Sequence, residues 1–357
     1  MLIKTNDMEC KTFDPDGVGV DNGTYFGLPF DPATAELVLV SAPWDVTVSY
    51  GAGAAYGPDA IIEASTQLDF HDPLAPGAWR RGIATADVDY SLQEASQRLR
   101  TDAARVIDHL EGGGSPDDEY VVRKVRRVNE GCAAMNANIE SQAARWLDAG
   151  RIVGLVGGDH STPYGLIRAL GARHAEFGIL HIDAHCDLRD AYEGFEFSHA
   201  SIMFNVLRDV PQAVRIAQVG VRDFSEGEAA LAASSERIAT FDDLSLAAAR
   251  FRGETWDDQC RRIVGTLPRE VYVSFDIDGL TFENCPHTGT PVSGGLTFNE
   301  AVWLLAVLAR SGRRIIGFDV VEVCPAPDQR IDAITGARIL WKLCGLTLAS
   351  NAEKAGK

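Results

Sequence analysis

The sequence has no apolar run long enough to cross a bilayer, and its first residues lack the apolar core of a secretory signal peptide. We therefore expect a cytoplasmic protein without a membrane partner. It also lacks an excess of basic residues, because 33 Lys and Arg stand against 51 Asp and Glu, a net charge of −18. This charge argues against nucleic acid as a partner and mildly favours a cationic small molecule.

Paired cysteine motifs are absent as well. The seven cysteines lack the two-by-two spacing of a zinc site, and an odd number argues against a disulfide framework. We expect a reducing compartment in which the thiols are mostly inert core residues. The chain also lacks the GK[ST] of a nucleotide-binding phosphate loop.

Apolar segments of strand length alternate with helical segments over residues 37–350. This alternation predicts a parallel sheet covered by helices on both faces. We find neither an internal repeat nor a clear linker, so we interpret 37–350 as a single α/β/α domain. Residues 1–36, rich in Asp, Gly, Asn and Pro, are expected to form an irregular N-terminal extension. Segment 111–120, EGGGSPDDEY, is expected to be a loop or a poorly ordered insert.

The expected elements can be placed by number. Strands are predicted at 35–40, 81–90, 151–158, 177–185, 215–221, 237–241, 270–278 and 314–323. Helices are predicted near 59–70, 94–109, 121–150, 164–170, 202–207, 256–266, 299–311 and 332–348.

Side chains that bind metals follow three of the predicted strands. The segment ILHIDAHCD ends in Asp183, His185 and Asp187, at alternate positions. Residues two apart on a strand point to the same side. If the backbone stays extended, these three share one side, while Ala184 and Cys186 face the other.

Two further strand ends carry the same residue types. VYVSFDIDGL places Asp276 and Asp278 two apart, and RIVGLVGGDHS ends in Asp159 and His160. Ligands collect at the carboxyl ends of strands in open parallel sheets, so we expect the three clusters to meet. Carboxylates crowded into one folded site are costly unless a cation joins them. We therefore expect a metal ion there, and more than one.

Each motif alone has a simpler explanation. A DxD after a strand is often a turn or a helix cap, and GGDHS alone can be a tight turn or a weak anion loop. His160 alone would more often be structural. The three motifs at three strand ends favour a metal centre together. Carboxylates and imidazoles suit Mn²⁺ better than thiolate-binding metals, and Ni²⁺ and Co²⁺ stay open as alternatives.

GGDHS, DAHCD and SFDIDGL, in this order, resemble the motifs of the ureohydrolase family of arginases and agmatinases. The resemblance extends over roughly residues 36–348 and includes Gly57–Pro58, TGTPVSGGL and VVEVCP. It implies an arginase-like three-layer α/β/α sandwich with a mainly parallel sheet and two Mn²⁺ per chain. It also implies hydrolysis of a guanidinium group to urea plus an amine, in a homo-oligomer, either a trimer or a hexamer.

The resemblance implies six metal ligands. They are His160 and Asp187 for the first ion, His185 and Asp278 for the second, and Asp183 and Asp276 as bridges. Cys186 lies within the motif at a position that varies in the family, and we interpret it as packing.

Three residues are expected to act on the substrate. The resemblance implies that Asp187 orients the attacking water, that His199 in FSHAS shuttles protons, and that Glu322 in VVEVCP grips the guanidinium in a bidentate pair. A solvated loop histidine is the simpler interpretation of His199. Asp319 is expected behind the ligands, and His181 is interpreted as packing. No role is assigned to His287, although its loop is expected to approach the site.

The loop after Asp187 governs the choice of substrate. Arg189 stands where arginases carry Asn, and the loop lacks their Ser/Thr-rich stretch for an α-carboxylate. It looks more like agmatinase loops, and its acidic Asp190, Glu193 and Glu196 favour a cationic substrate, so agmatine is expected first. Arg189 keeps a guanidino acid open, because it would pair with a carboxylate. Alternatively, Arg189 forms a local ion pair with Asp190 or Glu193.

Other substrates and another class of protein stay open. Arginine, 4-guanidinobutyrate and free guanidine are alternatives, as is a non-catalytic ureohydrolase-like protein that binds a partner. No expected ligand or shuttle is missing, which argues against the last. Thr281–Phe282 stands where the family commonly has Asp-Pro, which changes the loop beside the metals. The N-terminal extension and the 111–120 segment are each open as a cap over the site or a subunit contact.

Overall fold

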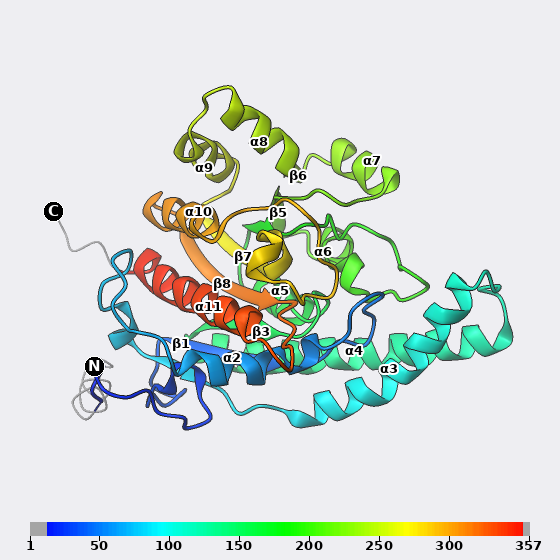
Figure 1. The fold of residues 1–357 in the computed structure, drawn as a ribbon, viewed down its shortest axis with the longest axis horizontal. Helices are drawn as coiled ribbons and strands as arrows, with labels where there is room; N and C mark the ends of the chain where they lie inside the picture. The colour runs from blue at the N-terminus through cyan, green and yellow to red at the C-terminus, as the bar shows by residue number, and fades with distance from the viewer. Residues whose placement is uncertain (1–12, 353–357) are drawn as a thin grey trace.

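The computed structural model describes residues 13–352, and its framework is an eight-stranded sheet in which all neighbouring strands are parallel (Figure 1). The order is β2-β1-β3-β8-β7-β4-β5-β6. The strands are β1 (Leu37–Ala42), β2 (Ile83–Thr85), β3 (Ile152–Gly157), β4 (Phe177–Ile182), β5 (Ala213–Val219), β6 (Ile238–Phe241), β7 (Glu270–Asp276) and β8 (Arg314–Val321). The predicted α/β class with a mainly parallel sheet is confirmed.

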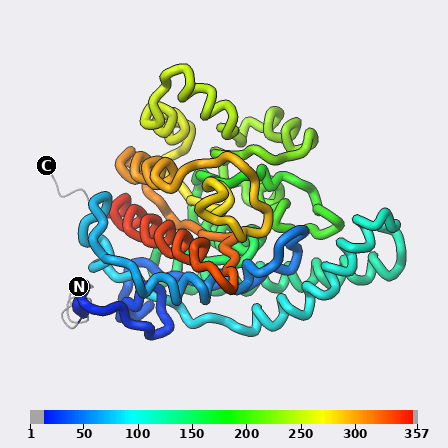
Figure 2. The backbone as a smooth tube through the Cα atoms, viewed as in Figure 1, coloured from blue at the N-terminus to red at the C-terminus, as the bar shows by residue number. Residues whose placement is uncertain are grey.

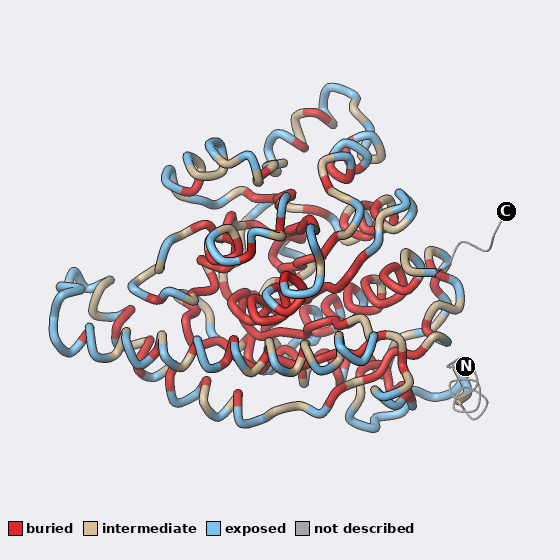
Figure 3. Tube along the Cα trace, turned by 180° about the vertical axis from the view of Figure 1, so that it is seen from behind, coloured by how far each residue is buried: buried red, intermediate tan, exposed pale blue. Residues whose placement is uncertain are grey.

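Helices cover both faces of the sheet, and each face has its own apolar core. One layer contains α2 (Gly57–Ser65), α9 (Trp256–Gly265), α10 (Phe298–Arg310) and α11 (Ile331–Ser350). The other contains α3 (Tyr90–Glu111), α4 (Glu119–Asp148), α5 (Tyr164–Gly171) and α6 (Ile202–Asp209). The central strands are almost completely buried (Figure 3), β4 at every residue and β8 at every residue after Arg314, because both faces are covered. The result is the three-layer α/β/α sandwich.

The two longest helices of the second layer, α3 and α4, run side by side and extend away from the sheet (Figure 2). Asp102 of α3 forms ion pairs with Lys124 and Arg127 of α4, which joins the two helices. The segment predicted as an insert is the tip of this hairpin. It is a short turn between Glu111 and Glu119, and its last residues already belong to α4.

The N-terminal segment, from residue 13 onward, is irregular apart from one turn of 3₁₀ helix at Tyr25–Gly27. It lies against the α2/α11 layer rather than over the strand ends. The Tyr25 hydroxyl is 2.7 Å from Oγ of Ser41, and the Phe26 ring meets Trp341 of α11 edge-on, with 4.9 Å between centroids. The part of the prediction that concerns residues 1–12 lies outside the described residues.

Most predicted elements are present, with ends shifted by a few residues, but two short helices were not predicted. These are α7 (Glu226–Ser234) and α8 (Asp243–Phe251). Helix α7 buries only Glu228 fully, so it has no apolar stripe for a periodicity argument to detect. A start signal was present, because Ser225 and Glu228 form a capping box.

The cysteines within the described residues are free and buried, as expected. None of the helices between residues 13 and 352 combines the length and apolarity needed to span a bilayer.

Candidate metal centre

Four neighbouring strands in the middle of the sheet, β3, β8, β7 and β4, end at the site. His160 follows β3, Glu322 follows β8, Asp276 ends β7, and Asp183 follows β4. Because parallel strands end on the same edge, these segments are brought together although they are far apart in the chain. The predicted meeting of the three motifs is therefore what the fold produces.

His160 is the centre of a first cluster. Its Nδ1 atom lies 2.9 Å from Oδ2 of Asp183, 3.0 Å from Oδ2 of Asp187 and 3.2 Å from Oδ2 of Asp276. All four side chains are almost completely buried. Three carboxylate oxygens thus converge on one imidazole nitrogen.

A second cluster surrounds His185. Its Nδ1 atom lies 3.1 Å from Oδ2 of Asp278 and 3.4 Å from Oδ1 of Asp183. Candidate ligand atoms of Asp183, His185 and Asp278 all lie within 4.8 Å of one another. Asp183 therefore directs one oxygen to each cluster, which is the geometry of a bridging carboxylate.

The backbone does not stay extended through this motif, so that part of the prediction is wrong. Strand β4 ends at Ile182, and Asp187 has a left-handed φ of 54°. The turn brings Asp187 back towards His160. Cys186 is buried, as its interpretation as packing required.

The buried carboxylates of the site lie so close together that an added positive charge would stabilise their ionised forms. Burial, together with Asp278 and Asp183, raises the pKa of Asp276 well above its usual range. Burial and Asp183 raise the pKa of Asp187 to about 6. Although burial opposes a charged imidazole, Asp183 and its neighbours raise the pKa of His160 well above its ordinary value.

The residues fit a metal ion on geometric grounds as well. The Nδ1 atom of His160 is buried without a hydrogen-bond partner among the described residues, although three carboxylate oxygens lie close to it. A metal ion would take the place of the Nδ1 proton: with the ring proton on Nε2, the Nδ1 lone pair and the three carboxylate oxygens would all bind the same cation. Oxygen and imidazole donors of this kind suit Mn²⁺ and related divalent ions.

The other ring nitrogen of His160 is held from behind. Its Nε2 atom lies 2.9 Å from Oγ of Ser274, and that hydroxyl donates to Oδ2 of Asp319 over 2.8 Å. Asp319 also accepts hydrogen bonds from the Tyr272 hydroxyl and from the backbone N–H of Phe275. Because Ser274 donates to Asp319, His160 donates to Ser274 and leaves Nδ1 free to bind an ion. The structure thus places Asp319 behind the ligands, as expected.

His181 was interpreted as packing, and this interpretation is wrong. Its side chain is fully buried, and its Nε2 atom lies 2.7 Å from Oδ2 of Asp183. The sequence spacing indicated this contact, because His181 and Asp183 are two residues apart at the end of an extended segment and therefore share a side.

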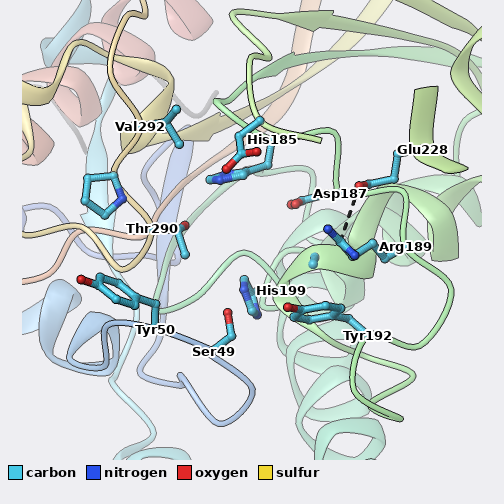
Figure 4. Close-up of a pocket in the computed structure, with 13 residues that line it drawn as sticks. Ser49, Tyr50, His185, Asp187, Arg189, Tyr192, His199, Glu228, Thr290 and Val292 are labelled. Atoms are coloured by element: carbon cyan, nitrogen blue, oxygen red, sulfur yellow. Dashed lines mark ion pairs between the residues drawn. The ribbon is translucent and has the colours of Figure 1, made fainter. Parts of the chain in front are cut away.

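A cavity of about 410 Å³ opens beside the clusters (Figure 4). Its lining residues come from the loops that follow several strands. They are Ser49, Tyr50, His185, Asp187, Arg189, Tyr192, His199, Ala200, Asp223, Glu228, Thr290, Pro291 and Val292. The cavity thus reaches His185 and Asp187 and is closed by the loop predicted to govern substrate choice.

His199 lines this cavity and is 9% exposed, so it is not a solvated loop histidine. Its backbone N–H donates to Oγ1 of Thr47 over 3.2 Å. Burial and the neighbouring His185 lower the pKa of His199 to about 3. Its imidazole is therefore neutral near pH 7.

Glu322 lies at the metal cluster but is not among the residues that line the cavity. Its Oε1 atom accepts the backbone N–H of His160 over 2.8 Å, and its backbone is left-handed, with φ of 61°. Burial and Asp159 raise the pKa of Glu322 well above its usual range. A cation that reached this carboxylate would stabilise its charged form.

Arg189 lies in the cavity, but the partners suggested for it were wrong. Its Nε atom is 3.5 Å from Oε2 of Glu228, and its guanidinium stacks at 4.6 Å on the ring of Tyr192 (Figure 4). The two partners expected for it, Asp190 and Glu193, form no ion pair with it in the described chain.

The acidic residues that were expected to attract a cation do not line this cavity. They are Asp190, Glu193 and Glu196, and they face two other surface hollows. Asp223 and Glu228, from the segment after β5, supply the acidic groups instead. They were missed because nothing in the local pattern around Asp223 indicates that its loop reaches the end of β4.

The loop after η6 (Phe282–Asn284) approaches the site through Thr290 rather than His287. The hydroxyl of Thr290 donates to Oδ2 of Asp278 over 3.4 Å. His287 turns away and bonds to Asp332 of α11 through both its backbone N–H and its ring.

Comparison with known proteins agrees with this geometry. A profile described as the arginase family matches residues 35–345. An agmatinase from Cronobacter sakazakii is 30% identical over 331 residues, covering 91% of this chain and 92% of the relative. An N(1)-aminopropylagmatine ureohydrolase from Thermus thermophilus is 29% identical over 312 residues, covering 87% and 90%. The solved proclavaminate amidino hydrolase from Streptomyces clavuligerus superposes with a TM-score of 0.69 at 23% identity, covering 92% and 97%.

Proposed function

The chain belongs to the arginase family and is a metal-dependent ureohydrolase, and we propose that it hydrolyses a small cationic guanidino compound, agmatine first, to urea and an amine. The observation that carries this proposal is the convergence of three carboxylates on His160 beside a cavity that also contains His185 and His199. As in the family, a homo-oligomer, trimeric or hexameric, and a cytoplasmic location form part of the proposal.

The six candidate ligands divide between two ions. His160 and Asp187 would hold one and His185 and Asp278 would hold the other, with Asp183 and Asp276 as ligands available to both. The two-sided placement of Asp183 supports this division most directly. Two Mn²⁺ per chain are proposed, with Ni²⁺ and Co²⁺ as alternatives. When bound, such a pair lowers the pKa of a shared water and so supplies a nucleophile near neutral pH.

The chain's own residues perform the remaining steps. Asp187 accepts a hydrogen bond from the attacking water and directs it to the guanidinium carbon. Glu322 holds the guanidinium, and charge pairing with that cation lowers its raised pKa. The bond from carbon to the substituted nitrogen breaks, and the leaving nitrogen takes up a proton. Since His199 is neutral, it acts as a relay: one ring nitrogen takes up a proton from solvent as the other gives its proton to the leaving nitrogen, so the ring ends neutral.

Agmatine is favoured because the acidic residues of the cavity wall outnumber its single basic residue. Asp223 and Glu228 face it, and Arg189 is the only Lys or Arg among its lining residues. A negative wall stabilises a second positive charge at the far end of the substrate. The names of two relatives, agmatinase and N(1)-aminopropylagmatine ureohydrolase, point to the same class of compound.

One observation favours a guanidino acid as a second candidate. Both oxygens of Glu228 already accept hydrogen bonds, one from the Leu188 N–H and the other from Ser225. Arg189 therefore has only a loose ion pair, and its guanidinium makes no hydrogen bond to any residue in the described chain. Placed on Tyr192 at the cavity, it would receive the carboxylate of a compound such as 4-guanidinobutyrate.

Urea release tests the proposal. The Mn²⁺-loaded protein is assayed with agmatine, N(1)-aminopropylagmatine, arginine, 4-guanidinobutyrate and free guanidine, with His160→Ala as the inactive control. Highest kcat/KM on agmatine or its derivative supports the first choice. If a guanidino acid is best and loses its advantage in Arg189→Ala, the second candidate replaces it. Urea release from none of the five contradicts the proposed substrate class and favours a non-catalytic protein.

A further inference from the structure

A row of polar side chains crosses the sheet one step behind the metal ligands. It contains one residue from each of five neighbouring strands, β8, β7, β4, β5 and β6. The residues are Asp319, Ser274, His181, Gln218 and Thr240, and each is the direct strand-to-strand partner of the next. All but Thr240 are fully buried. Polar groups inside such a sheet are costly unless they are hydrogen-bonded, so the row calls for a reason.

One half of this row, Asp319 and Ser274, is hydrogen-bonded to His160. The other half, Thr240, Gln218 and His181, forms a hydrogen-bonded chain that ends at Asp183. Thr240 donates to Oε1 of Gln218 over 3.3 Å, and Nε2 of Gln218 lies 2.7 Å from the carbonyl oxygen of Cys186 and 3.4 Å from Nδ1 of His181. Nε2 of His181 then lies 2.7 Å from Oδ2 of Asp183.

The donor and acceptor roles in these hydrogen bonds follow from the carbonyl group of Cys186. The carbonyl oxygen of Cys186 only accepts, so the amide of Gln218 must present its NH₂ group there. The same NH₂ group faces Nδ1 of His181, which is therefore the acceptor. His181 then carries its proton on Nε2 and donates it to Asp183. One lone pair of Oδ2 is thus occupied, and the carboxylate keeps one oxygen directed at each cluster.

We propose that Gln218 and His181 are positioning residues that fix the orientation of the bridging carboxylate Asp183 and thereby set the affinity of the centre for its two ions. The inference rests on the proposed function for the presence of the ions, but its hydrogen bonds lie within the protein. Partners of this kind behind a metal ligand typically contribute about 10–100-fold to metal affinity.

Paired variants distinguish positioning from packing. His181→Leu fills much of the space but cannot donate, whereas His181→Gln places an amide N–H near the position of Nε2. Gln218→Met keeps the size of the side chain and removes its amide. Gln259→Met is the matched control, because Gln259 is equally buried but donates to Leu246 in the layer of α9.

The experiment is calorimetric titration of metal-free full-length protein with Mn²⁺, with thermal unfolding to verify that each variant is folded. His181→Leu and Gln218→Met are expected to bind Mn²⁺ about 10–100-fold more weakly than the parent protein, while His181→Gln recovers most of the loss and Gln259→Met loses nothing. The proposal is overturned if His181→Leu binds as the parent does, or if His181→Gln is as weak as His181→Leu.

A second readout does not need the metal. ¹⁵N-edited NMR of the metal-free protein reports which ring nitrogen of His181 carries the proton. Protonation on Nε2 that moves or becomes mixed in Gln218→Met supports the inference, and protonation on Nδ1 in the parent protein overturns it. If the parent protein binds no Mn²⁺ at all, the proposed function fails, and this NMR result alone decides the role of Gln218.

Discussion

The Nδ1 atom of His160 lies 2.9 Å from Oδ2 of Asp183, although β8 and β7 separate the strands that carry these residues. The contact is possible because both side chains lie at the carboxyl ends of β8 and β7, the two strands between β3 and β4. Asp276, the last residue of β7, lies at the same point. Each strand thus supplies charge to a point that none of them reaches alone. This convergence explains why the motifs are widely spaced in sequence and close in space.

Replacing His199 by alanine is expected to lower kcat by about 10²–10⁴-fold, because the side chain is assigned a proton relay rather than a metal bond. Mn²⁺ content should be unchanged by elemental analysis. Partial rescue of kcat by added imidazole would agree with the relay. Unchanged turnover in a weak, non-donating buffer would remove His199 from the reaction.

Replacing Asp276 by asparagine is expected to stabilise the metal-free protein and to abolish the stability that Mn²⁺ adds. The pKa of Asp276 is raised in the folded state, so its contribution to stability is present below the unfolded carboxyl pKa and is lost as the pH rises. The unfolding temperature of metal-free Asp276→Asn should therefore exceed that of the parent by a few degrees near pH 7, with a difference that shrinks towards pH 4.

The matched control for that variant is Asp117→Asn, in the exposed turn between α3 and α4. It should leave both the metal-free unfolding temperature and the Mn²⁺ effect unchanged. A metal-free Asp276→Asn protein less stable than the parent at pH 7 would contradict the account of crowded carboxylates.

Asp102 should show the opposite dependence on pH. Lys124 lowers its pKa, with Arg127 contributing, so its stabilising effect is present above the unfolded carboxyl pKa and is lost as the pH falls through the lower folded value. Asp102→Asn is expected to reduce the free energy of unfolding by about 1–3 kcal/mol at pH 7, with less difference below pH 4. Urea unfolding of metal-free protein measures this.

A surface pair on the same helix provides the comparison for Asp102. Glu94 and Arg98 are exposed and 3.9 Å apart, so Glu94→Gln should change the free energy of unfolding by less than about 1 kcal/mol. An equal decrease in the free energy of unfolding in the two variants would mean that the ion pairs between α3 and α4 stabilise the protein no more than an exposed pair does.

The sheet and the strand ends that carry the candidate ligands were predictable from the sequence because their signals are local, whereas the set of six ligands followed from the resemblance to the ureohydrolase family. A strand that is apolar throughout marks a central position, and Asp183 or Asp276 directly after it marks the end where ligands gather. Asp319 was expected behind the ligands because it lies on the same strand as Glu322. These inferences needed only the order of residues within one strand.

The residues that were missed depend on neighbours from other strands. His181 was taken for packing although its spacing from Asp183 indicated their contact, and its second partner, Gln218 on β5, is brought to it only by the register of β4 with β5. Glu193 was expected, with Asp190 and Glu196, to favour a cationic substrate, but it lines another hollow and not the cavity beside the metal cluster. Helix α7 was missed since it buries little apolar surface, although Glu228 on it contributes to the cavity.

The most direct test of the metal centre is anomalous X-ray diffraction from crystals loaded with Mn²⁺. The account predicts two anomalous peaks per chain, one against His160 and Asp187 and the other against His185 and Asp278, with Asp183 in contact with both. The peaks should be about 3.5–4 Å apart, as in other two-metal sites. A single peak per chain, or peaks outside this cluster, would contradict the assignment of this centre as a two-metal ureohydrolase site.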